Sequence, residues 1–185
     1  MKRIIPTATL LLIPSVALAH PGHATGLLAG FGHPFTGADH LLAMLGVGLW
    51  AAILGGKARW ALPATFLTAM ALGGAFAMTL GLGVLAAAVE PAILASVILL
   101  GAAVALALRA PLALALPMVA LFGLAHGAAH GTEMVGNGLV FGAAMLAATA
   151  CLHGLGLALG LSLNFRLARV LGSATTVAGL ALVFA

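Results

Sequence analysis

The sequence is nearly devoid of acidic side chains and has little charge of either sign. Of its 185 residues only three are Asp or Glu, tyrosine does not occur, and 5% of the chain is charged, whereas 64% is hydrophobic. The mean hydropathy is +1.27. This composition excludes a water-soluble globule, so the sequence predicts an integral membrane protein.

Three further absences limit the possible functions of the chain: a basic run, a second cysteine and a nucleotide-binding motif. The seven Lys and Arg residues are scattered without a basic run, so the net charge of +4 does not indicate a nucleic-acid partner. The single cysteine, Cys151, has no partner within the chain for a disulfide. The Walker A phosphate-binding motif is also absent, so we expect no ATP-driven step.

The N-terminal segment has the pattern of a secretory signal peptide. Residues 1–19 begin with two basic residues after the methionine, continue through an apolar stretch, and finish with the sequence ALA, a typical cleavage site. Cleavage would make His20 the mature N-terminus, with His23 close by. The alternative is an uncleaved first helix. We expect cleavage, and a single transmembrane domain over residues 20–185.

Six apolar runs of membrane-spanning length follow. A helix needs about 20 apolar residues to cross the hydrocarbon core. The runs are 37–55, 61–83, 90–108, 112–131, 137–161 and 169–185. Residues 24–34 are apolar but too short to span, and Gly32, Pro34 and Gly37 predict a break, as in a short re-entrant or interfacial segment. The predicted fold is therefore all-α, a bundle of six transmembrane helices.

The basic residues predict the orientation of this bundle. If the mature N-terminus lies outside, every Lys and Arg of the mature chain falls on the cytoplasmic side: Lys57, Arg59, Arg109, Arg166 and Arg169. We therefore expect a multi-pass protein of the cytoplasmic (inner) membrane, embedded in the lipid bilayer, with both mature termini in the periplasm. Nothing in the sequence indicates an oligomeric partner.

The acids and histidines gather at the outer ends of the predicted helices. The group comprises His20, His23, His33, Asp39, His40, Glu90, His126, His130 and Glu133. His153 alone lies deeper, in the inner half of the fifth span. Ionisable groups are costly inside a membrane and usually functional, so we interpret this gathering as a site.

The first constellation is GHPFTGADHLLAM, residues 32–44. On a helix, His33 and His40 are seven residues apart and share a face, and Met44 lies one turn beyond His40. Asp39 is expected to point elsewhere from His40. It is either a ligand reached through a bend in the chain or an acceptor that fixes the tautomer of a neighbouring imidazole.

The second constellation is HGAAHGTE, residues 126–133, in which His126, His130 and Glu133 have the spacing i, i+4 and i+7. These positions differ by about 40° or less around a helix of 3.6 residues per turn, so the side chains share one stripe. Imidazole nitrogens with a carboxylate suit borderline divalent metals such as Ni, Co, Zn and Cu. Because both constellations lie on the outer side, we expect them to meet.

HPFTGADHLLAM resembles the HPxxGxDHxxxM signature of the HupE/UreJ family of nickel permeases, and HGAAHGTE is similar to the second histidine-rich motif of that family. The resemblance covers the whole mature chain. It implies ATP-independent passage of Ni(II), or of Co(II) in some members, across the cytoplasmic membrane for hydrogenase or urease maturation. The implied metal-binding positions are His33, Asp39, His40, His126, His130 and Glu133.

We accordingly predict a permease whose metal is cargo rather than a permanently bound cofactor. His20 and His23 would capture the ion, the two constellations would partly dehydrate it, and Glu90 would compensate its charge. Further inward, a relay could be formed by His153 with Thr68 and Met70.

Two other functions fit the same residues. In an intramembrane zinc-dependent hydrolase, three histidines would hold a catalytic metal and Asp39 would assist the bound water. The serines of the mature chain argue against it, because all are expected to lie away from the cluster: Ser96, Ser162 and Ser173. A metal sensor or storage protein without transport is the remaining alternative.

Overall fold

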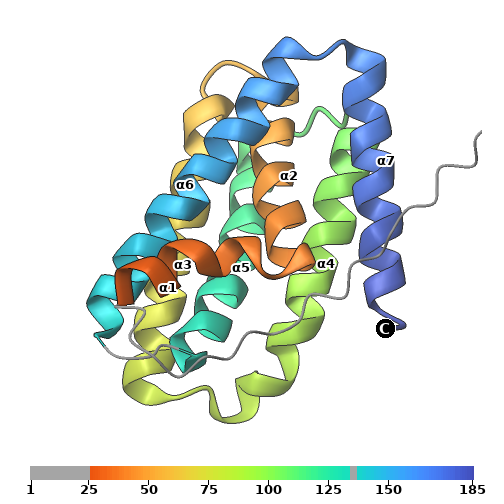
Figure 1. Ribbon diagram of the computed structural model, residues 1–185. Coiled ribbons are helices and arrows are strands. Elements are labelled where there is room, and N and C mark those ends of the chain that lie inside the picture. The colour runs from red at the N-terminus through yellow and green to blue at the C-terminus, as the bar shows by residue number, and fades with distance from the viewer. Residues whose placement is uncertain (1–25, 134–136) are drawn as a thin grey trace, which may run out of the picture.

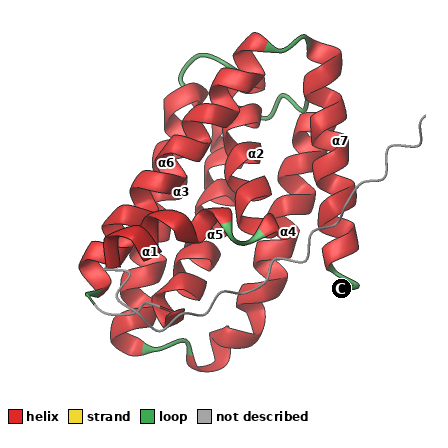
Figure 2. Ribbon diagram, viewed as in Figure 1, coloured by secondary structure: helices red, strands yellow, loops and turns green. Residues whose placement is uncertain are grey.

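The protein is described by a computed structural model that covers residues 26–133 and 137–185. The part that is described contains helices and no strands (Figure 2). The helices are α1 (Gly26–Gly32), the 3-10 turn η1 (His33–Phe35), α2 (Ala38–Leu54), α3 (Ala58–Leu80), the 3-10 turn η2 (Gly83–Leu85), α4 (Ala86–Ala105), α5 (Leu112–Glu133), α6 (Gly138–Ser162) and α7 (Phe165–Leu182). The predicted signal peptide, His20 and His23 lie outside the described residues.

The predicted bundle of membrane-spanning helices is confirmed. Helices α3 to α7 are each long and apolar enough to cross a membrane, and the bent pair of α1–η1 and α2 makes a sixth candidate when it is counted as one span. The observed helix ends differ from the predicted spans by no more than four residues. The apolar runs of the sequence therefore predicted the position of each of these helices.

The first span is broken where the sequence predicts a break. The axes of the α1–η1 segment and α2 differ by 77°, and α1 crosses the bundle instead of running along it (Figure 1). Pro34 lies inside η1, and Gly37 leaves helical geometry with φ −105° and ψ 125° before α2 begins. At the crossing with α6, a Cβ on Gly30 would overlap the carbonyl of Phe141. A glycine is therefore needed for α1 to lie against α6.

The basic side chains gather at one end of the bundle. The connections α2–α3, α4–α5 and α6–α7 all lie at the same end, opposite the α3–α4 connection (Figure 1). The basic residues within the described ranges are in these three connections or in the first residues of the helices that follow them: Lys57, Arg59, Arg109, Arg166 and Arg169. These basic residues therefore share one end of the bundle, as the sequence predicts.

Close helix contacts depend on small residues. On the α3–α5 contact, a Cβ on Gly127 would overlap the carbonyl of Met70, and Gly131 faces Gly74 in the same way. On the α2–α6 contact, Gly48 and Gly156 each face the backbone of the other helix. Small residues at such crossings let helix backbones approach within a bilayer, where apolar surface alone does not drive association.

The outside of the bundle is apolar and several polar side chains are inside it. Large hydrophobic side chains are exposed along its length, as at Leu139 and Phe184, which are 83% and 89% exposed. In the part of the chain that is described, the buried polar residues are Ser96, His126, His130, Thr149, His153 and Thr175. An apolar outer surface suits a protein surrounded by lipid, and ionisable side chains buried within such a bundle mark a candidate functional site.

Candidate metal site

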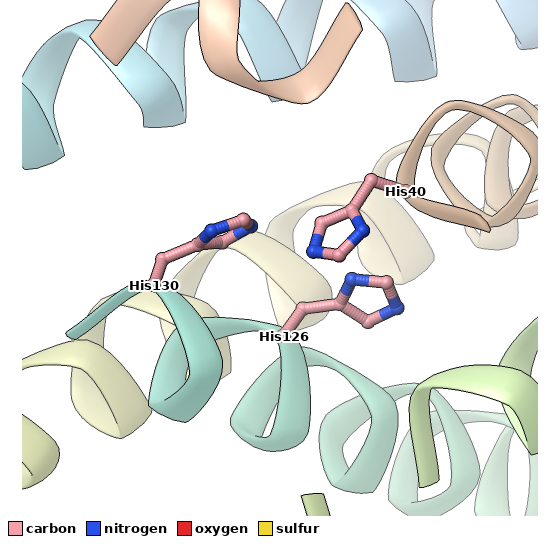
Figure 3. Close-up of side chains that lie close together, drawn as sticks. All are labelled: His40, His126 and His130. Atoms are coloured by element: carbon pink, nitrogen blue, oxygen red, sulfur yellow. The ribbon is translucent and has the colours of Figure 1, made fainter. Parts of the chain in front are cut away.

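Three histidines from two helices converge inside the bundle (Figure 3). His40 comes from the first turn of α2, and His126 and His130 come from successive turns of α5. One ring nitrogen of each lies within 4.8 Å of the others. Metal–imidazole bonds are about 2.0–2.1 Å long, so small rotations of the rings would bring all three nitrogens onto one ion. The expected meeting of the two histidine motifs is therefore present.

The orientation of α5 follows from the glycine that comes after each of its two histidines. Because Gly127 and Gly131 have no side chain, α5 packs directly against the backbone of α3 at these two positions. This contact fixes the rotation of α5 about its own axis, which turns the adjacent histidine stripe into the bundle. As a result His126 is fully buried and His130 is 1% exposed.

The tautomer of His40 is fixed by its neighbour in sequence. Asp39 Oδ1 accepts hydrogen bonds from His40 Nδ1 and from the backbone N–H of His40, both at 2.8 Å. The ring proton is thus on Nδ1, and the buried Nε2 keeps its lone pair with no hydrogen-bond partner in the described ranges. The expectation that Asp39 points away from His40 was wrong. Both residues belong to the first turn of α2, where a carboxylate folds back towards free backbone N–H groups.

The tautomer of His126 is fixed by a serine on α4. Ser96 donates its only hydroxyl proton to the carbonyl of Ile93 at 2.6 Å, so towards His126 Nε2, 3.0 Å away, its oxygen can only accept. Nε2 therefore carries the proton of the ring. Nδ1, buried and with no hydrogen-bond partner in the described parts of the chain, keeps its lone pair. The two rings present complementary nitrogens, Nε2 of His40 and Nδ1 of His126, to one point.

Ser96 was expected to lie away from the cluster, and this was wrong. The residue is thirty positions from His126 in sequence, and only the packing of α4 beside α5 brings the two together. The sequence carries one signal for it, because Ser96 and Glu90 are the two polar residues of α4 and Ser96 is the one with a hydroxyl.

Replacing Ser96 by alanine is expected to weaken Ni(II) binding by about tenfold, because partners that orient a ligating imidazole contribute 10–100-fold in metal affinity. The measurement is a nickel titration of the purified protein. Ser173→Ala is the matched control, since that hydroxyl is exposed and donates to the carbonyl of Arg169 in its own helix. Equal affinities for the Ser96→Ala chain and the wild type would contradict the assigned role.

Of the other residues predicted for the site, His33 and Glu90 lie outside the group of His40, His126 and His130. The half-buried ring of His33 in η1 lies 4.6 Å from that of His130 and 5.6 Å from that of Phe141, outside the three-histidine group. Glu133 is the last residue of α5, and its side chain is outside the described part. Glu90 is exposed on α4, and the structure does not bring it into the group.

Of the residues predicted to form an inner relay, some are buried in the bundle and one is exposed on its surface. Met44 and Met70 are buried, and the Thr149 hydroxyl oxygen lies 3.4 and 3.8 Å from their sulfurs, close enough to donate its proton to either one. His153 is buried and bonds through Nδ1 to the carbonyl of Met44 at 2.7 Å. Thr68 is exposed on the outer surface of α3, so its proposed part in the relay was wrong. Its position on α3 faces away from the contact that Met70 makes with α6.

An all-helical bundle with a broken first span and a buried group of histidines defines a multi-pass membrane protein with a candidate transition-metal site. The HupE / UreJ protein family matches residues 8–182 of this chain. Protein HupE of Rhizobium leguminosarum bv. viciae is 43% identical over 190 residues, covering 98% of this chain and 97% of that protein. The chain belongs to the HupE/UreJ family. No solved structure matches it.

Membership of this family has two consequences. It gives the chain an accessory role in the transport of nickel or cobalt. The family is one of transporters, not enzymes, so the zinc-dependent hydrolase considered from the sequence is set aside.

Proposed function

We propose that the protein is a secondary permease that carries Ni(II), with Co(II) as the alternative cargo, from the periplasm to the cytoplasm. The observation that carries the proposal is the convergence of His40, His126 and His130 inside a membrane bundle, with one nitrogen from each within 4.8 Å. Family membership supports transport of nickel or cobalt, and neutral imidazoles are preferred ligands for both ions.

The charge of the site favours transport over storage. Three neutral imidazoles add no charge, and Asp39 is the one carboxylate that touches the histidine group among the described side chains. A divalent ion would therefore keep part of its positive charge in an apolar interior. Binding that is strong enough for entry but incompletely compensated allows the ion to leave again, as conduction requires.

The membrane potential supplies a sufficient driving force. The positive-inside rule supports placing the end of the bundle that carries Lys57, Arg59, Arg109, Arg166 and Arg169 in the cytoplasm, and the break before α2 towards the periplasm. Moving one charge through 100 mV releases about 2.3 kcal/mol, so a divalent ion gains about 4.6 kcal/mol on entry. We therefore assign the protein to the inner membrane, with both mature termini periplasmic, where it would supply hydrogenase or urease maturation.

Nickel accumulation tests the proposal. Cells without nickel importers would express the wild type, His40→Ala or Leu124→Ala, the last an exposed position on α5. We expect radioactive nickel uptake with the wild type and Leu124→Ala, and background uptake with His40→Ala at equal membrane abundance. Cobalt and zinc as competitors rank the metals. Equal uptake with His40→Ala, or none with the wild type, would overturn the proposal.

A further inference from the structure

A fourth histidine lies deeper in the bundle with one nitrogen unused. His153 on α6 is 1% exposed, and its Nδ1 lies 2.7 Å from the carbonyl of Met44. A carbonyl can only accept, so Nδ1 carries the proton of the neutral ring and Nε2 carries the lone pair. Nε2 is buried and has no hydrogen-bond partner among the residues that the structure describes. A buried acceptor left in this state is costly, and such groups need an explanation.

Two connections join His153 to the three-histidine site. The first is α2, because Met44, whose carbonyl holds His153, is one helical turn inward from His40. The second is Phe66 of α3, whose buried ring lies 5.4 Å from the ring of His126 and 5.0 Å from that of His153. One aromatic ring therefore stands between the outer site and the inner histidine.

The side chains one helical turn outward from His153 carry atoms that suit a borderline or soft cation. Thr149 lies one turn outward from His153 on α6, about 6 Å along the helix axis. Its hydroxyl contacts the thioether sulfurs of Met44 and Met70, and all three side chains are buried. Thioethers and imidazoles favour late first-row metals over Mg or Ca.

We propose that Nε2 of His153 is an inner binding station for the transported divalent metal, occupied after the ion leaves the three-histidine site. This inference rests on the proposed transport function. A single imidazole binds a metal more weakly than three, so the station would accept the ion and release it inward. Movement between sites of this kind is what rapid passage needs.

The test variant is His153→Asn. The asparagine amide can replace Nδ1–H as a donor to the Met44 carbonyl, but it has no atom at the position of Nε2, so it separates the structural role from metal binding. Cys151→Ala, at an exposed position two residues earlier on α6, is the matched control. Both variants and the wild type would be reconstituted in lipid nanodiscs for Ni(II) titration, and expressed in cells for nickel uptake.

We expect His153→Asn to keep the tight nickel site with an affinity within about twofold of the wild type, to lose one weak equivalent, and to lower the initial uptake rate at least about tenfold. Unchanged uptake and binding would overturn the inference. So would loss of the tight site together with uptake, because His153 would then only hold the bundle together. If the wild type binds nickel but transports none, the proposed function fails, and the weak equivalent alone decides the inference.

Discussion

Replacing His126 by alanine is expected to weaken Ni(II) binding by more than about a hundredfold and to abolish uptake, while the protein remains in the membrane. His126 is fully buried and its Nδ1 is turned to the common point by Ser96. Loss of a partner that only orients a ligand costs 10–100-fold, so loss of the ligand itself costs more. The measurement is a nickel titration of the purified protein together with uptake in cells.

The control for this variant is Leu124→Ala, which removes an exposed side chain two residues earlier on the same helix. It should leave both readouts unchanged. If the His126→Ala chain folds and binds nickel with the affinity of the wild type, the three-histidine site is not the place where the metal binds.

Replacing Gly127 by alanine is expected to lower the thermal unfolding temperature sharply and to reduce nickel binding at the same time. The added Cβ would overlap the carbonyl of Met70, which is backbone and cannot rotate away. Overpacking of a close contact costs about 1–3 kcal/mol, and more where only separation of the helices relieves it. That separation would also move His126, the residue next to Gly127, out of the site.

Gly154→Ala is the matched control, because a Cβ at that helical position of α6 meets nothing. Alanine is favoured over glycine in a helix by about 1 kcal/mol, so this variant should be as stable as the wild type or slightly more so. Equal unfolding temperatures for Gly127→Ala and Gly154→Ala would show that the α3–α5 contact does not position the histidines.

The break before α2 explains why Asp39 stands beside His40. The N-terminus of a helix carries partial positive charge, which disfavours a cation bound there. His40 lies in the first turn of α2, so the site is close to this end. The Asp39 carboxylate offsets that charge and at the same time accepts the ring proton of His40. Broken helices occur at membrane depth where they build an ion site, because the helix end that the break creates carries a partial charge.

The spans and the histidine stripe could be read from the sequence because both depend on local patterns. An apolar run of about 20 residues is a property of one segment, and the spacing of His126 and His130 decides which side of α5 they share. The break at Pro34 and Gly37 could be read for the same reason, since both residues act on their own backbone.

The contacts around the histidines could not be read in this way, because they depend on how helices are rotated and paired. The bond from Ser96 to His126 joins α4 to α5, and the bond from His153 to the Met44 carbonyl joins α6 to α2. Helix rotation is set by glycine contacts such as Gly127 with Met70, which have no signature in hydropathy. The exposed position of Thr68 has the same origin, since apolar helices show little amphipathic pattern from which a face could be chosen.

X-ray absorption at the nickel edge would show whether His40, His126 and His130 together hold the metal. The purified protein would carry less than one nickel per chain, so that the tightest site is filled first. We expect the outer-shell scattering of three imidazoles around nickel, with one imidazole lost in the His40→Ala chain. A spectrum without imidazole scattering, or one that His40→Ala leaves unchanged, would contradict it.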